Sequence, residues 1–261
     1  MSYSSTLEFD LPTALRDQIV AQLRRMKPAT LSESNITAMG ISGDGQGVYQ
    51  LFYKGELAYI GKTDLEAGLR KRLLRHANKI SSRKNIEKKD VKFLSLRVYV
   101  YSAMDLESSL IAYYKKQKTP AFWNTSGFGS NDPGRQRDTS GVKESHFDSL
   151  YPIDLDWSVG EALIESKTIA DALIILKKNT PYLIRFETNR KKAPHADLAN
   201  CAAPQFNKNE SVGSALLKIS RSLGAKWQIT ALPGYVIVYR EKREYAHGTV
   251  IKYTSKKRPA S

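Results

Sequence analysis

The stretch from Gly47 to Gly61 constrains the fold of this chain more than any other part of the sequence. Its first half alternates side chains with a period of two and is rich in aromatic and aliphatic residues, the pattern of a β-strand. A short turn around Gly55 follows, and the second half runs back. Antiparallel pairing of the two halves brings Tyr49 and Tyr59 near each other. The stretch therefore predicts a β-hairpin, and taken alone it fits an ordinary hairpin with core-packed tyrosines equally well.

Later segments add polar side chains to this hairpin. Residues 69–77 carry apolar side chains on one helical face, and Arg72 and His76 lie one turn apart on another. A second amphipathic segment places Glu107 among apolar neighbours, and Asn124 follows shortly after it. Taken alone, Glu107 also fits an ordinary glutamate on the surface of a helix.

These residues together resemble the motifs of the GIY-YIG nuclease domain, in family order: Gly47-Val48-Tyr49, Tyr59-Ile60-Gly61, Arg72, Glu107 and Asn124. The Gly127-Phe128-Gly129 stretch, followed by Asp-Pro-Gly-Arg, resembles more narrowly the SacII-type branch of type II restriction endonucleases, which cut the palindrome CCGCGG. This likeness extends roughly from residue 7 to residue 188. It implies an α/β (α+β) fold, with a GIY-YIG core of a small three-stranded antiparallel sheet flanked by helices.

We expect three regions in the chain. Residues 1–46 form an N-terminal helix and arm, and residues 47–157 form the catalytic domain with a DNA-reading loop. Residues 158–261 form a C-terminal α/β extension for DNA contact or oligomerisation. Hydrophobic periodicity predicts further elements. They are helices at 13–26, 159–178 and 211–223, strands at 91–101 and 182–186, a polar loop at 81–90 and a hairpin at 227–240.

The resemblance assigns catalytic roles to the tyrosines and the charged residues near them. Tyr49 becomes the general base, but a phenol with a pKa near 10 needs an acceptor for its own proton. His76 suits that role because imidazole titrates near pH 7, although a packing role is the alternative. Arg72 holds the scissile phosphate, and Tyr59 hydrogen-bonds the phosphate or orders the attacking water.

Glu107 is expected to bind a single Mg²⁺ ion, with water and phosphate oxygens as the other ligands. Asn124 either positions the backbone or the attacking group, or is purely structural. Arg70 and Arg75 are rivals of Arg72 for the phosphate. No organic small-molecule cofactor is expected.

The net charge of +15 indicates a polyanionic partner, here double-stranded DNA, and a merely basic protein is the alternative. Residues 61–92 hold eleven Lys and Arg against four Asp and Glu. We expect phosphate contacts from this part of the chain. The predicted phosphate contacts are Lys62, Arg83, Lys84, Lys88 and Lys89. Side chains able to read base edges follow the last catalytic residue, and a solvated loop is the alternative for them; they are Arg135, Gln136 and Arg137.

The leading hypothesis is a Mg²⁺-dependent type II restriction endonuclease of a restriction-modification system in the bacterial cytoplasm. A GIY-YIG nuclease of repair or mobile-element type, and a non-catalytic DNA-binding protein on the same scaffold, are the alternatives. No apolar run is long enough for a membrane span, and Cys201 is alone, so no disulfide framework is expected.

A palindromic site favours a homo-oligomer, at least a dimer, with a tetramer as an alternative. The apolar residues Trp227 and 235–239 either complete the subunit's own core or bury against a second dimer.

Overall fold

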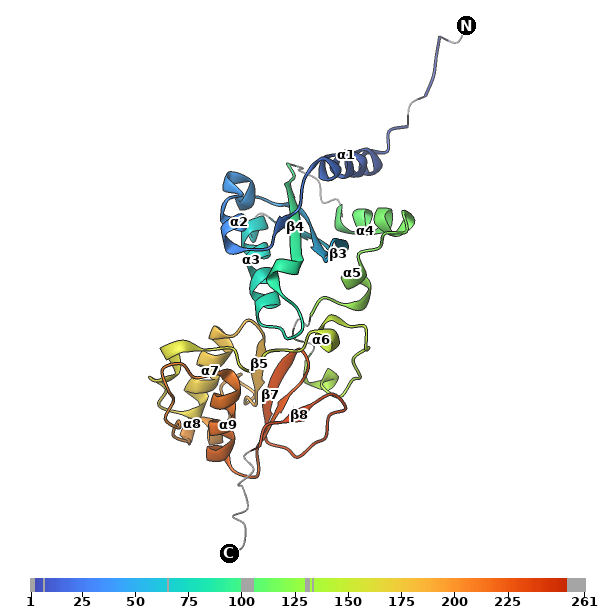
Figure 1. Ribbon diagram of the computed structural model, residues 1–261. Helices are drawn as coiled ribbons and strands as arrows, with labels where there is room; N and C mark the ends of the chain where they lie inside the picture. Colours follow the sequence, from blue (N-terminus) through green and yellow to red (C-terminus); the bar gives the residue numbers. More distant parts are fainter. Residues whose placement is uncertain are drawn as a thin grey trace, which may run out of the picture. The chain divides into compact units, whose positions relative to one another are not determined.

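The computed structural model describes residues 3–6, 8–64, 66–99, 106–129, 132 and 134–252. It is a mixed α+β structure with two four-stranded sheets, as the sequence predicts for the fold class (Figure 1). The chain divides into two compact units, an N-terminal unit (1–81 and 86–128) and a C-terminal unit (82–85 and 129–261). Within the described residues, no helix is both long and apolar enough to cross a membrane.

The division differs from the three expected regions. It falls after Phe128 and not after residue 157, and the described part of residues 1–46 lies in the N-terminal unit. Leu31 and Ile36, from the expected surface arm, are fully buried there. Isolated apolar residues in a polar, glycine-containing stretch carry no periodicity, so the sequence pattern gave no sign of their burial.

The N-terminal unit is built on an antiparallel sheet of strand order β1-β4-β2-β3. Its strands are β1 (Ala29–Thr30), β2 (Gly47–Tyr53), β3 (Glu56–Thr63) and β4 (Val91–Arg97). The predicted hairpin is therefore confirmed as β2 and β3. The expectation of three strands is incomplete, because β1 pairs with β4, and a two-residue strand shows no alternation.

Helices cover both faces of this sheet. The predicted helix at 13–26 is confirmed as α1 (Leu11–Arg25), which begins at the capping Asp10. It shares an apolar cluster with Val48, Ile60 and Leu110, the last from α4 (Leu106–Lys116). Helix α3 (Gly68–Ser81) packs against the opposite face, where Tyr49 points because successive side chains of a strand alternate. The short elements are α2 (Glu33–Thr37), η1 (Gly40–Asp44), η2 (Lys88–Asp90) and α5 (Phe122–Ser126).

The C-terminal unit has its own sheet of order β5-β7-β6-β8. Strand β5 runs parallel to β7, and the other two pairs are antiparallel. The strands are β5 (Leu183–Phe186), β6 (Gln228–Ala231), β7 (Tyr235–Tyr239) and β8 (Thr249–Val250). The helices are η3 (Arg135–Arg137), α6 (Phe147–Leu150), η4 (Gly160–Leu163), α7 (Ile169–Asn179), α8 (Ala196–Asn200) and α9 (Val212–Leu223).

Helices α7, α8 and α9 lie on one side of the C-terminal sheet (Figure 1). The strand at 182–186, the helix at 211–223 and the hairpin at 227–240 are confirmed with small shifts of boundary. The prediction of a single helix at 159–178 is wrong, because this segment contains two separate helices, η4 and α7. Thr168 and Asp171 form a capping box that starts α7, and this local signal outweighs the apolar periodicity that runs through it.

The apolar residues of β7 are buried within the C-terminal unit itself. Val236 and Val238 face α7 and α9, while Tyr235, Ile237 and Tyr239 form a cluster on the other face. Trp227, at 8 % exposure, packs with the first group. These side chains therefore complete the unit's own core, and they offer no surface for a second dimer.

Candidate active site and DNA-reading turn

The two hairpin tyrosines meet on the α3 face of the N-terminal sheet. Tyr49 pairs with Gly61 across β2 and β3, and the ring centres of Tyr49 and Tyr59 are 6.1 Å apart, as predicted. A Cβ atom at Gly61 would collide with the phenol of Tyr49, and one at Gly47 would collide with the carbonyl oxygen of Leu96. The two glycines thus leave room for the Tyr49 ring and for close approach of β4.

Helix α3 brings Arg72 and His76 to Tyr49, and the two side chains share one helix face, as their one-turn spacing predicts. The Tyr49 hydroxyl lies 2.8 Å from Nε2 of His76, and Arg72 Nε donates to the Tyr49 oxygen at 3.2 Å. A guanidinium group can only donate, so the Tyr49 oxygen accepts from Arg72 and keeps its own hydrogen for another acceptor. A hydrogen-bond chain thus joins Arg72 through Tyr49 to Nε2 of His76, while the buried Nδ1 of His76 has no hydrogen-bond partner among the described residues.

Burial keeps both proton-carrying groups neutral. Tyr49 is fully buried, and this burial raises the pKa of its phenol well above 10.0, with the Arg72 hydrogen bond opposing the shift. Burial also raises the pKa of Tyr59. His76 is 3 % exposed, and desolvation, then the charges of Lys79 and Arg72, lowers its pKa well below 6.5. At neutral pH the site therefore holds a neutral imidazole that accepts a hydrogen bond from a protonated phenol.

Phe128 closes the site and was not among the predicted site residues. Its ring lies 4.8 Å from that of Tyr59 and 5.0 Å from that of His76, and it stacks on Trp123 at 4.7 Å. Lys79 Nζ donates to the Phe128 carbonyl at 2.9 Å. The signal in the sequence was the pair of flanking glycines, since Gly127 and Gly129 both adopt a positive φ.

The three arginines of α3 have different surroundings. The charge of Arg72 also opposes the rise in the pKa of Tyr59, so Arg72 acts on both phenols. Arg70 instead donates to the carbonyl oxygens of Thr37 and Gly40 and pairs with Asp44, so it holds η1 against α3. Arg75 is exposed. Of the three candidates, Arg72 is the one that contacts the tyrosines.

Glu107 lies in the first turn of α4 and is partly buried. After burial, its negative charge is the next cause that raises the pKa of Tyr59, and it contributes in the same sense at Tyr49. No group of three or more His, Cys, Asp or Glu side chains able to hold a metal occurs among the described residues. One carboxylate suits Mg²⁺, which usually keeps several waters and takes one or two protein carboxylates plus phosphate oxygens.

Asn124, in α5, binds the backbone of the second tyrosine strand. Its Oδ1 accepts from the Ile60 amide at 2.7 Å, and its Nδ2 donates to the Ile60 carbonyl at 2.9 Å. Both ends of the amide are engaged with the residue next to Tyr59. Of the roles left open by the sequence, positioning of the backbone is the one that these contacts describe.

The residues predicted to contact DNA phosphate differ in burial and in their ion pairs. Arg83 is 6 % exposed and forms a buried ion pair with Asp148 at 2.8 Å, so its assignment to DNA phosphate is wrong. The pairing depends on a residue far along the chain, which local charge counting does not detect. Lys84 lies 3.6 Å from Asp154 and 3.8 Å from Asp156, and Lys89 pairs with Glu87.

Lys62 and Lys88 are exposed. Lys62 pairs with Val48 across the sheet, so its side chain leaves on the face opposite Tyr49. Arg70 and Arg83 are used inside the protein, so the basic stretch offers fewer cations to a partner than its composition suggests.

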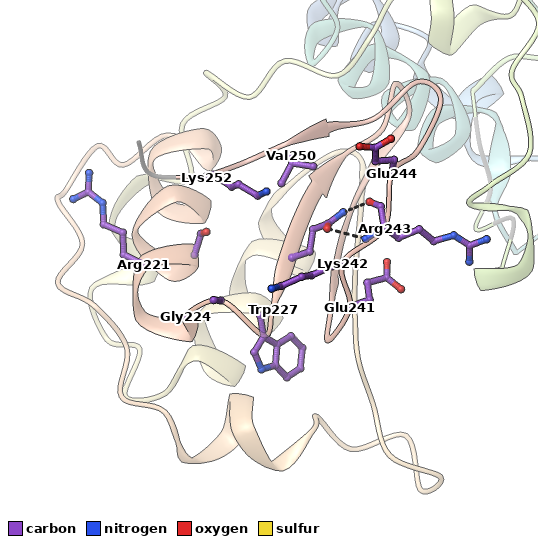
Figure 2. Close-up of a pocket in the computed structure, with 12 residues that line it drawn as sticks. Arg221, Gly224, Trp227, Glu241, Lys242, Arg243, Glu244, Val250 and Lys252 are labelled. Atoms are coloured by element: carbon purple, nitrogen blue, oxygen red, sulfur yellow. Dashed lines mark hydrogen bonds between the residues drawn. The ribbon is translucent and has the colours of Figure 1, made fainter. Parts of the chain in front are cut away.

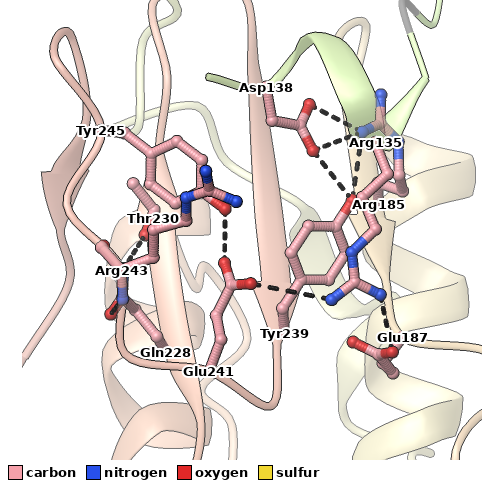
Figure 3. Close-up of polar contacts among 10 residues, drawn as sticks. All are labelled: Arg135, Asp138, Arg185, Glu187, Gln228, Thr230, Tyr239, Glu241, Arg243 and Tyr245. Atoms are coloured by element: carbon pink, nitrogen blue, oxygen red, sulfur yellow. Dashed lines mark hydrogen bonds and ion pairs between the residues drawn. The ribbon is translucent and has the colours of Figure 1, made fainter.

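The predicted base-reading residues form the short η3 turn of the C-terminal unit. Gln136 and Arg137 are exposed. Arg135 is half exposed, pairs with Glu187 at 2.7 Å and Glu241 at 3.6 Å, and stacks over the Tyr239 ring at 4.3 Å (Figure 3). The acidic partners raise its pKa. The turn therefore presents two arginines, one of them held in a fixed orientation.

The C-terminal unit also has a hollow of about 910 Å³ beside the end of α9 (Figure 2). Its lining includes Arg221, Trp227, Lys242, Arg243 and Lys252. It contains none of the predicted catalytic residues, and it joins no titratable group with a perturbed pKa to a nucleophile. The hollow is therefore not the candidate active site.

No model of a known protein family matches this chain, and no curated protein is significantly similar to it.

Proposed function

We propose that this protein is a Mg²⁺-dependent endonuclease that hydrolyses double-stranded DNA. The observation that carries the proposal is the buried chain from Arg72 through Tyr49 to His76, in which a neutral imidazole lies 2.8 Å from a phenol oxygen. Groups with strongly shifted pKa values and an adjacent proton acceptor are typical of catalytic sites. The positive charge of the chain suits a polyanionic substrate.

Tyr49 acts in this proposal as a relay for one proton. As water attacks the phosphorus, its proton passes to the Tyr49 oxygen, and the Tyr49 hydrogen passes to Nε2 of His76. The imidazole becomes charged, the new P–O bond forms, and the bond to the leaving oxygen breaks. The leaving oxygen takes a proton from solvent, and His76 later returns its proton to solvent through Tyr49. This relay works with Tyr49 protonated in the resting enzyme. It needs no phenolate, a form that the raised pKa of Tyr49 disfavours.

Arg72 is oriented by its hydrogen bond to Tyr49 and supplies a cation to the scissile phosphate. Its Nε is used by Tyr49, which leaves the terminal nitrogens of the guanidinium for phosphate oxygens. Glu107 is the residue that would hold Mg²⁺, which when bound neutralises charge on the phosphate and the leaving oxygen. That positive charge would also offset the effect by which Glu107 raises the pKa of Tyr59.

Within this function we propose a type II restriction endonuclease that recognises a short G/C-rich palindrome, CCGCGG by resemblance, in the bacterial cytoplasm. Arg135 and Arg137 suit guanine, whose O6 and N7 accept a bidentate pair of hydrogen bonds, and Gln136 suits adenine. One chain carries one set of catalytic residues. Cutting both strands of a palindrome therefore calls for two copies, and we propose a homo-oligomer that is at least dimeric.

Incubation with a sequenced plasmid and Mg²⁺, followed by mapping of the new ends, tests this function. We expect cleavage at one short repeated sequence, and none with excess chelator. Cleavage without sequence preference would refute the restriction assignment and keep the nuclease. Absence of cleavage by folded protein on DNA rich in G/C palindromes would refute the nuclease itself.

A further inference from the structure

The η3 turn is attached at both ends to one partly buried arginine of the C-terminal sheet. Arg185, on β5, pairs with Asp132 before the turn and with Asp138 after it. Its Nη1 lies 2.8 Å from each carboxylate oxygen of Asp138, and its Nη2 contacts Asp132. One guanidinium group thus closes the loop that carries Arg135 and Arg137. Figure 3 shows its contact with Asp138.

Asp138 is the centre of this attachment. It is 5 % exposed, and its two oxygens also accept hydrogen bonds from Tyr235 at 2.7 Å and Tyr239 at 3.1 Å. Both phenols remain protonated donors, because burial raises the pKa of Tyr235 and raises that of Tyr239 to about 12. A buried carboxylate with this many donors fixes the position of its backbone.

The geometry of the sheet explains why these groups meet. Leu183, Arg185 and Ile237 share the face opposite α7 and α9, since β5 and β7 pair in parallel register. Glu187 directly follows β5, and Glu241 lies two residues after the end of β7. Together they bind the guanidinium of Arg135.

We propose that the C-terminal sheet is the platform that positions the η3 turn for base reading, with Arg185 as its clamp. The proposal rests on the proposed function and assigns a role to the part of the chain beyond the catalytic residues. Arg185 and Asp138 are positioning residues that do not touch DNA. They hold Arg135 and Arg137 in place before binding, and this preorganisation lowers the entropic cost of specific contacts.

The test compares Arg185→Lys with Lys218→Met. A lysine keeps the positive charge but cannot bind Asp132 and Asp138 together through a planar fork. Lys218 pairs at 2.6 Å with the buried carboxylate of Glu210 in the same unit, away from the turn. The second variant therefore controls for general loss of stability when a partly buried ion pair is broken.

Two readouts separate the clamp from the proposed function. The first is amide hydrogen exchange in 134–140, where Arg137, Asp138 and Ser140 donate backbone hydrogen bonds within the turn. The second is the ratio of single-turnover cleavage rates at the preferred site and at a site with one base pair changed. We expect Arg185→Lys to speed exchange in the turn and to lower the ratio at least about tenfold. Lys218→Met should leave both unchanged.

Equal exchange in the turn for both variants would overturn the clamp. Faster exchange with an unchanged cleavage ratio would overturn the role in base reading. If the wild-type protein cleaves without sequence preference, the restriction assignment fails and the base-reading role fails with it. The exchange measurement then still decides whether Arg185 holds the turn.

Discussion

Each unit of this protein buries a polar cluster around tyrosine hydroxyls. The two clusters differ in whether their central groups are charged or neutral. In the C-terminal unit the Asp138 carboxylate is matched by the Arg185 guanidinium and by two phenol donors. In the N-terminal unit Tyr49 and His76 meet as neutral groups, with pKa values shifted in opposite directions. Matched charges hold a segment in place, whereas neutral groups poised to exchange a proton suit catalysis.

The largest effect should come from the carboxylate of the N-terminal cluster. Glu107→Gln removes the charge that would bind Mg²⁺, and we expect cleavage to fall by about 10³-fold or more. Binding of cognate DNA, measured by fluorescence anisotropy, should remain close to the wild-type value. Cleavage at the full rate in Mg²⁺ would remove Glu107 as the metal ligand.

His76→Gln should have the next largest effect. Glutamine can hydrogen-bond the Tyr49 hydroxyl but cannot take its proton, so the single-turnover rate should fall by about 10²-fold or more. Affinity for DNA should change little. A lowered melting temperature with a normal rate per folded molecule would show that His76 serves packing alone.

Alanine substitutions of Arg135 and Arg137 test the cluster of the C-terminal unit, through the turn that it holds. Each should lose about 1–3 kcal/mol of preference for the cognate site while the chemical step at saturating DNA is retained. Lys88→Ala is the control. Loss of this exposed lysine should weaken binding to all DNA sequences equally, and it should reduce the slope of log affinity against log salt concentration by about one. Equal losses on cognate and random DNA for the arginine variants would exclude base reading by the turn.

The smallest effect concerns stability. His76 binds its proton less readily when folded, because burial and the charges of Lys79, Arg72 and Arg75 oppose protonation. The unfolded chain therefore takes up the extra proton as the pH falls below about 6.5. The free energy of unfolding should decrease there by up to about 1.4 kcal/mol per pH unit and remain flat above pH 7.

The control for this pH effect is His76→Gln, whose neighbours Tyr49 and Tyr59 do not titrate in that range. Chemical denaturation at pH 7.5, 6.5 and 5.5 measures the difference between the two proteins. An identical pH dependence would contradict the burial of a neutral imidazole.

Local patterns predicted the elements that have a repeating signal. The alternation in β2 and β3, the apolar face of α1 and the capped helix α9 all lie close to where the sequence indicates. Spacing also predicted that Arg72 and His76 share a helix face, and the family resemblance predicted that this face lies beside the tyrosines. The sequence placed these candidate residues without showing what they contact.

The features that escaped prediction depend on partners far along the chain. In the sequence Arg83 is one of many basic residues that are expected to be exposed. It is buried because it forms an ion pair with Asp148, which lies far along the chain. The clamp of Arg185 on Asp132 and Asp138 likewise joins a turn to a strand in a way that no local period reveals. Phe128 was hidden because its two glycines read as loop residues, although their positive φ values direct its ring into the site.

The most direct test of the account is the single-turnover cleavage of a supercoiled plasmid by Tyr49→Phe. The substitution deletes one oxygen from a fully buried ring and leaves the shape of the site. If Tyr49 relays the proton, the rate in saturating Mg²⁺ should fall by about 10²–10⁴-fold while DNA affinity and melting temperature stay near wild type. A variant that cleaves at the wild-type rate would contradict the central claim that this cluster performs the chemistry.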